Sequence, residues 1–150
     1  MIIDILITLG LVFLNAFFVA SEFAIVKVRS SQVEVQKAAG GLRARIASGI
    51  VNKLDAYLAA TQLGITIASL GLGWIGEPVV AKIIMGIMDM LNITVAPETA
   101  HNIALPVAFF LITFLHIVFG ELAPKSIAIR YPAHTTFWLG APLKFFYYLF

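Results

Sequence analysis

The sequence predicts an all-α integral membrane domain, with three transmembrane helices, short interfacial helices and a cytoplasmic juxtamembrane helix. Hydrophobic residues make up 61% of the 150 residues and charged residues 12%, about half the charged share of a typical soluble domain. Three apolar stretches are long enough to cross a bilayer at about 1.5 Å per residue. Charged residues are divided unequally between the connections that join these stretches, as in multi-pass membrane proteins.

The expected spans are residues 5–26, 57–76 and 103–119, and the third has a possible kinked continuation to residue 129. The first span is predicted to be retained, because Asp4 is its only early charge and no small-residue cleavage pattern follows. The chain has no cysteine, which excludes disulfides, thiolate metal sites and cysteine nucleophiles.

The connections are expected to contain helices of their own. Between the first two spans, apolar residues recur at helical spacing from Val35 to Ile46, which predicts one interfacial helix weakened in the middle by Gly40 and Gly41. After the second span, Glu77-Pro78 resembles a helix start, and an apolar stripe follows for about 14 residues. This helix is short for a span, so we expect a partial or surface helix packed on the spans.

The last stretch of the chain is interrupted by Pro132 and Pro142 and is rich in aromatic residues, with Lys144 among them. This composition is typical of a membrane interface. It favours a helix along the cytoplasmic leaflet over a fourth span cut short. The chain ends inside this apolar run, so we expect the natural protein to continue into further cytoplasmic sequence.

Charge asymmetry predicts the orientation in the cell membrane. The connection between the first two spans carries Lys27, Arg29, Lys37, Arg43, Arg45 and Lys53 against Glu34 and Asp55. The next connection carries Lys82 alone against Glu77, Asp89 and Glu98. The positive-inside rule then places the first connection and the carboxyl terminus in the cytoplasm, and the amino terminus outside. The net charge of +2 suits lipid headgroups, and no basic cluster with interleaved aromatics suggests nucleic acid.

The segment 116–125 (HIVFGELAPK) is the strongest functional signal. Pro124 has no backbone N–H, so it bends or stops a helix and frees carbonyl groups about one turn earlier, near Gly120 and Glu121. Free carbonyls beside a carboxylate suit a hard cation. The plainer alternative is that Glu121 and Lys125, four residues apart, form an ordinary ion pair at the membrane edge.

Polar residues also form stripes within the spans. Gln62, Thr66, Ser69 and Gly73 share one face of the second span, and Asn15 and Glu22 share a face of the first, with Ser21 beside it. Such stripes either serve helix packing or line an ion site. The available oxygen ligands favour Mg²⁺, Ca²⁺ or Na⁺ over zinc or copper. His116 lacks the paired spacing of a zinc ligand and is interpreted as a packed or hydrogen-bonded residue.

Three segments together carry a family resemblance: 15–24 (NAFFVASEFA), 58–78 (LAATQLGITIASLGLGWIGEP) and 119–128 (FGELAPKSIA). They occur in the order found in the CNNM/CorC family, and the chain resembles its transmembrane domain over nearly its whole length. The resemblance implies a homodimeric magnesium transporter that exchanges Mg²⁺ against Na⁺, with ATP bound only by cytoplasmic CBS domains beyond this segment. It also implies an ion site at Ser21, Ser69, Gly120 and Glu121, with Asn15, Glu22 and Thr66 as weaker candidates.

These expectations define residues 1–150 as a transmembrane ion-transport domain, and the expected function is Na⁺-coupled export of Mg²⁺. One alternative is a membrane scaffold that senses Mg²⁺ and regulates a separate transporter. Catalytic motifs are absent, so the chain is not expected to be an enzyme, although Glu121 could act as a general base in an intramembrane one. Straight, perpendicular spans would place Ser21 and Glu121 near the cytoplasmic end and Ser69 outside the midplane, so kinks, unwinding or tilt are required to bring them together.

Overall fold

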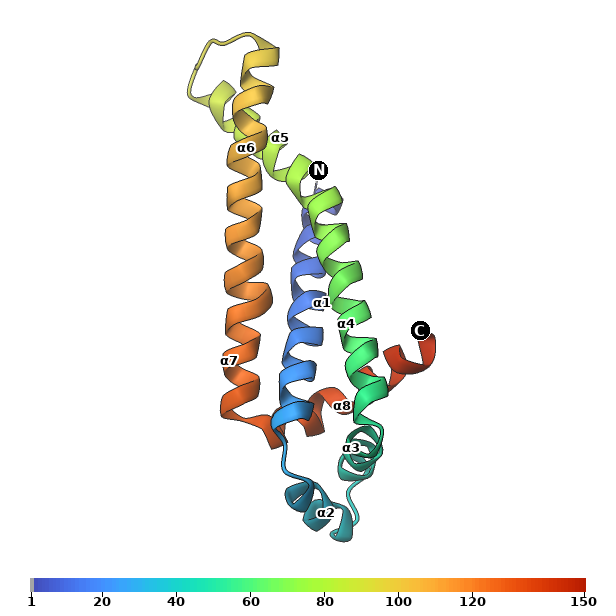
Figure 1. The fold of residues 1–150 in the computed structure, drawn as a ribbon. Helices are drawn as coiled ribbons and strands as arrows, with labels where there is room; N and C mark the ends of the chain where they lie inside the picture. Colours follow the sequence, from blue (N-terminus) through green and yellow to red (C-terminus); the bar gives the residue numbers. More distant parts are fainter. Residues whose placement is uncertain (1) are drawn as a thin grey trace.

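The computed structural model describes residues 2–150, which fold into helices with no strand among them (Figure 1). The domain contains three helical rods, and each is long and apolar enough to cross a membrane: Ile2–Lys27, Leu54–Met90 and Pro97–Arg130. The first rod is α1 (Ile2–Lys27); the second is α4 (Leu54–Gly71), η1 (Leu72–Gly76) and α5 (Glu77–Met90); the third is α6 (Pro97–Leu115), η2 (His116–Leu122) and α7 (Ala123–Arg130). The predicted all-α, three-span architecture is therefore confirmed.

The two long composite rods each contain a π-helical segment that ends two residues before a proline. Segment η1 precedes Pro78, and η2 precedes Pro124. Proline cannot donate the usual bond to the carbonyl four residues earlier, so the helix widens there, and at η2 the Ala123 N–H bonds to the carbonyl of Val118, five residues back. The third rod therefore changes to π-helical hydrogen bonding at η2 and continues to Arg130, which confirms the predicted continuation of the third span.

The helix predicted to begin at Glu77 does begin there and is 14 residues long. The expectation was a partial or surface helix packed on the spans, and the structure adds that η1 joins this helix to α4 without a break. It packs against α6 through a small-residue contact of Ala81 with Ala104 and Ala108. Small side chains let two helices approach closely, which is typical of contacts between spans.

Three shorter helices gather at one end of the rods: α2 (Ser30–Ala38), α3 (Leu42–Asn52) and α8 (Pro132–Leu149). The prediction of a single interfacial helix between the first two spans is wrong, because the chain forms both α2 and α3 there. Gly40 has a positive φ of 87°, a conformation that ends α2 and turns the chain into α3.

Helix α8 crosses the end of the bundle and packs on α1, α3 and α7 (Figure 1). Pro132 lies in its first turn, whereas Pro142 lies inside it without ending it, so the expected interruption at Pro142 is absent. Within residues 2–150, α8 is not among the helices that meet the length and hydropathy of a span. This agrees with the favoured interfacial placement.

Helix α1 lies between the other two rods and forms the centre of the domain (Figure 1). Its contact with α4 is close, since a Cβ atom built on Gly64 would lie 2.6 Å from the Phe18 ring. Near α3 and α8, Ile25, Ile50, Tyr57 and Leu143 form a buried cluster that ties the short helices to the rods. These contacts hold α1 against α4 and connect both helices to α3 and α8.

Candidate functional site

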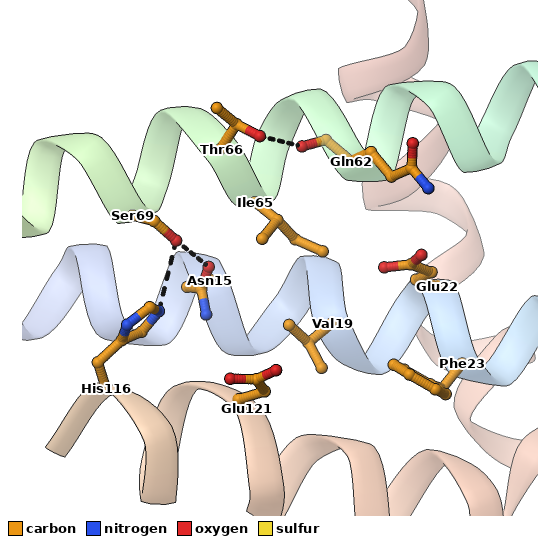
Figure 2. Close-up of a pocket in the computed structure, with 10 residues that line it drawn as sticks. All are labelled: Asn15, Val19, Glu22, Phe23, Gln62, Ile65, Thr66, Ser69, His116 and Glu121. Atoms are coloured by element: carbon orange, nitrogen blue, oxygen red, sulfur yellow. Dashed lines mark hydrogen bonds between the residues drawn. The ribbon is translucent and has the colours of Figure 1, made fainter. Parts of the chain in front are cut away.

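A cavity of about 540 Å³ lies between α1, α4 and η2 (Figure 2). Its lining combines two carboxylates, an imidazole and several neutral oxygens with a few apolar side chains. The lining residues are Asn15, Val19, Glu22, Phe23, Gln62, Ile65, Thr66, Ser69, His116 and Glu121. Polar groups from all three rods thus face one space within the predicted membrane region.

Asn15 is the centre of a hydrogen-bonded chain that joins the three rods. Its side-chain amide donates to the carbonyl oxygen of Gly120 at 2.8 Å, and its carbonyl oxygen Oδ1 accepts from the Ser69 hydroxyl at 3.2 Å. The Ser69 hydroxyl also lies 3.4 Å from Nε2 of His116. Asn15 is only 1% exposed, so these bonds satisfy a polar side chain that would otherwise be costly to bury.

Gly120 suits this position for two reasons. Pro124, four residues later, has no N–H to donate to the Gly120 carbonyl, so the oxygen is free to accept the bond from Asn15. A Cβ atom at Gly120 would lie 3.0 Å from Cδ2 of His116 and 3.1 Å from Nδ2 of Asn15, tighter than ordinary contact. The bond from Asn15 agrees with the predicted release of a carbonyl near Gly120, and the absent side chain allows α1 to approach η2.

The two carboxylates lie on opposite walls of the cavity, Glu22 on α1 and Glu121 on η2 (Figure 2). The alternative ion pair between Glu121 and Lys125 is not formed. The Lys125 ammonium group instead lies 4.7 Å from the ring centroid of Phe23, as a cation–π contact. Across residues 2–150, no lysine or arginine forms an ion pair with either glutamate.

The structure brings most of the predicted site residues together. Ser69 and Glu121 line the cavity, as do the weaker candidates Asn15, Glu22 and Thr66. Gly120 lies behind the lining and contributes its carbonyl to Asn15. The Thr66 hydroxyl donates to the carbonyl of Gln62 within its own helix.

Ser21 is the exception among the predicted site residues. It is 1% exposed and donates its hydroxyl to the carbonyl of Phe17 at 2.7 Å, and it is not part of the cavity lining. It lies six residues beyond Asn15 on α1, about 9 Å along the helix axis, whereas Ser69 is level with Asn15. The expected difficulty in joining Ser21 to Ser69 is therefore real in this conformation.

Two polar lining residues, Gln62 and His116, were not among the predicted site residues. Gln62 belongs to the polar stripe that contains Thr66 and Ser69, and it lines the cavity together with Glu22. His116 is hydrogen-bonded to Ser69, in agreement with its interpretation as a hydrogen-bonded residue. The helical spacing of the stripe was the available signal for Gln62, and the position of His116 one turn before Gly120 was the signal for that residue.

The donor set determines which ions the cavity can bind. Within residues 2–150, no group of three or more histidine, cysteine, aspartate or glutamate side chains is placed to hold a metal ion. The oxygens of Asn15, Ser69, Glu22 and Glu121 suit a hard cation that keeps part of its water. Six waters at about 30 Å³ each would occupy about 180 Å³, so the volume of about 540 Å³ is large enough for a hydrated ion.

Three spanning rods around an oxygen-lined cavity define a multi-pass membrane domain with a polar chamber between its spans. Residues 6–150 match the family described as the Cyclin M transmembrane N-terminal domain, and the chain belongs to this CNNM family.

Similar proteins include UPF0053 proteins of Bacillus subtilis strain 168. The chain is 45% identical to YhdT over 148 residues, which cover 98% of this chain and 32% of YhdT. It is 43% identical to YugS over 148 residues, covering 98% of this chain and 34% of YugS. It is also 33% identical to Rv1841c of Mycobacterium tuberculosis strain H37Rv over 138 residues, covering 92% of this chain and 38% of that protein. The chain therefore spans about a third of the length of these relatives.

Proposed function

We propose that this domain transports Mg²⁺ across the membrane in exchange for Na⁺, and that its normal direction is export. The observation that carries the proposal is the chamber between α1, α4 and η2, where two carboxylates without cationic partners face neutral oxygens. Carboxylates within a membrane span are expensive to maintain and usually mark ion pathways. Membership of the CNNM family supports the same function.

In this proposal Glu22 and Glu121 supply the negative charge that offsets the partial dehydration of Mg²⁺. Ser69 and Asn15 supply neutral oxygens at the deeper end of the chamber, and the Gly120 carbonyl becomes available when the Asn15 amide turns away. Ser21 joins the ligands only after α1 rotates or its hydroxyl leaves the Phe17 carbonyl. Exchange between such arrangements would alternately open the site to the two sides of the membrane.

The proposal includes a homodimer in the bilayer, oriented with the amino terminus outside. Exposed apolar side chains on α4 and α6, including Ile67, Leu70, Phe110 and Phe114, leave broad faces that can meet lipid or a second copy. A mass corrected for bound detergent should equal two chains, and a mass of one chain well above micromolar concentration would contradict the dimer.

The test of transport is flux of Mg²⁺ into liposomes that contain only the purified full-length protein. Flux that requires Glu121 and responds to a Na⁺ gradient is the expected result. The second candidate function, a Mg²⁺-sensing scaffold, is favoured by the closed hydrogen-bonded chain through Asn15, which holds the three rods together. A scaffold would bind Mg²⁺ with the same residues and give no flux.

A further inference from the structure

A second polar pocket lies outside the transport chamber, where α3, the beginning of α4 and the end of α8 meet. Its lining carries three cationic side chains, Arg45, Lys53 and Lys144, and three tyrosines, Tyr57, Tyr147 and Tyr148. Among residues 2–150, no carboxylate side chain lines it. In the part of the chain that the structure describes, none of these three cations forms an ion pair. The pocket therefore concentrates positive charge and phenol hydroxyl donors around a space with no counter-charge of its own.

The pocket is built by packing between helices. Tyr57 is 4% exposed, and its ring stacks on that of Tyr147 with centroids 4.2 Å apart and an interplanar angle of 18°. This stack fixes α8 against α4. The Lys144 ammonium group lies 6.0 Å from the Tyr148 ring centroid, which keeps the lysine near the same helix end.

The volume of the pocket limits what it can hold. At about 110 Å³ it has room for a few water molecules of about 30 Å³ each. A typical small-molecule site is about 300–1,000 Å³. A single tetrahedral anion such as a phosphate group matches the size and charge of this pocket, and the rest of any larger ligand must lie outside it.

An apolar groove of about 220 Å³ shares Tyr147 with this pocket and extends from it along α4. Its floor is made by Ala56, Ala59, Ala60 and Leu63, which follow one another at helical spacing on one face of α4. Phe150 lies on the other side of the groove. A cationic pocket that leads directly into an apolar groove on a spanning helix matches the two ends of a phospholipid.

We propose that Arg45, Lys53 and Lys144 bind the phosphate of an anionic phospholipid at the end of the bundle predicted to be cytoplasmic, and that one acyl chain of this lipid lies in the groove on α4. Basic pockets between helices on the cytoplasmic side are suited to anionic headgroups. The negative surface charge of the cytoplasmic leaflet also attracts basic side chains. Free phosphate has the same anionic chemistry, but it would leave the groove empty. The bound lipid connects α3, α4 and α8, so it would hold the crossing helix α8 against the second rod.

The test measures binding of dioleoylphosphatidylglycerol to the full-length protein in neutral detergent, through the rise in its thermal unfolding midpoint. Dioleoylphosphatidylcholine and inorganic phosphate are the parallel probes. The double variant Lys53→Gln with Lys144→Gln should weaken phosphatidylglycerol binding about 25-fold, at about fivefold for each cation lost. The matched control, Lys37→Gln with Lys82→Gln, makes the same change in net charge away from the pocket and should leave binding unchanged.

A second pair of variants tests the groove. Ala59 is exposed on α4, so Ala59→Phe should fill the groove without disturbing the core and should weaken phosphatidylglycerol binding. Ile67→Phe, on an exposed position of the same helix outside the groove, should not. The proposed site would be overturned if phosphatidylcholine stabilised the protein as much as phosphatidylglycerol does. It would also be overturned if Lys37→Gln with Lys82→Gln lost as much phosphatidylglycerol binding as Lys53→Gln with Lys144→Gln. A different result is that inorganic phosphate raises the unfolding midpoint in a way that depends on Lys53 and Lys144, while Ala59→Phe has no effect. That result would overturn the proposal of a bound lipid and indicate a site for free phosphate.

Discussion

The side-chain amide of Asn15 donates to the carbonyl oxygen of Gly120 at 2.8 Å, across 105 positions of the chain. This bond joins the first rod to the third. At the same level, the Ser69 hydroxyl of the second rod donates to the Asn15 side chain. The bond from Asn15 to Gly120 exists because Pro124 has no N–H for that carbonyl and because Gly120 has no side chain to keep α1 away. The same deviation from regular helix therefore provides both the packing contact and a carbonyl oxygen that bonds to another rod.

Replacing Asn15 by leucine should destabilise the domain. The Gly120 carbonyl and the Ser69 hydroxyl would lose the Asn15 side chain as a hydrogen-bond partner, at a cost of about 1–3 kcal/mol. The measurement is the thermal unfolding midpoint in detergent. Thr136→Val is the matched control, because Thr136 is equally buried and its hydroxyl bonds only within its own helix, to Pro132. Equal losses in the two variants would show that the bond between the rods contributes nothing beyond a local one.

The close approach of α1 and α4 leads to a prediction about glycine. Gly64→Ala places a Cβ atom 2.6 Å from the Phe18 ring, which is 1% exposed and packed edge to face with Phe17 and Phe146. The ring cannot move away cheaply, so the variant should lose about 1–3 kcal/mol of stability.

Gly86 provides the control for this substitution. Nothing lies within 4 Å of a Cβ atom there, so Gly86→Ala should be neutral or should gain about 0.5–1 kcal/mol, as expected for alanine in a helix. The double variant Gly64→Ala with Phe18→Leu should recover part of the loss, because the smaller side chain makes room. Unfolding midpoints of the natural protein, of these variants and of the single variant Phe18→Leu test the clash, and additive losses in the double variant would contradict it.

The predicted cation site leads to a third prediction. Glu121→Gln should weaken Mg²⁺ binding at least about tenfold, because a lost unit charge near a divalent ion removes several kcal/mol of attraction at an effective dielectric constant of about 20. The readout is stabilisation of the protein by Mg²⁺ against unfolding. Glu98→Gln is the control, since Glu98 lies in the first turn of α6 and outside the chamber. Equal Mg²⁺ stabilisation of both variants would remove Glu121 from the site.

Much of the fold follows from periodicity and from proline. The apolar stretches predicted the three spans, Glu77-Pro78 predicted the start of α5, and Pro124 predicted the free carbonyl at Gly120. The division of the first connection into α2 and α3 was missed, because helical spacing continued across Gly40 while its backbone turned to positive φ. Pro142 was expected to interrupt the last helix, yet tertiary contacts of α8 with the bundle outweigh its local effect.

The sequence predicted which residues form the candidate site better than it predicted how those residues align between the helices. Spacing alone showed that Asn15 and Glu22 share a face of α1, and that Thr66 and Ser69 share a face of α4. The depth of the residues along straight spans indicated that Ser21 lies away from Ser69, but spacing could not show that Asn15 is the residue level with Ser69, because that depends on the vertical offset between two rods. The offset is determined by close contacts such as Gly64 with Phe18, which helical periodicity does not encode.

The last prediction concerns how Na⁺ and Mg²⁺ share the chamber. Mg²⁺ requires near-octahedral oxygen ligands at about 2.0–2.1 Å and releases water reluctantly, while Na⁺ carries half the charge. Two carboxylates, Glu22 and Glu121, can balance one divalent ion, but a sodium ion added beside it would meet strong repulsion. The two ions should therefore exclude each other.

An equilibrium titration of Mg²⁺ at rising Na⁺ tests this exclusion, with ionic strength held constant by a bulky organic cation. The apparent Mg²⁺ affinity of the natural protein should fall as Na⁺ rises. Thr66→Val, which removes a hydroxyl already bonded to Gln62 within α4, should leave this competition unchanged, whereas Ser69→Ala removes a cavity oxygen and should weaken the binding of both ions. A Mg²⁺ affinity that is indifferent to Na⁺ would leave binding intact but remove the physical basis for coupling, since exchange at one site requires that each ion displaces the other.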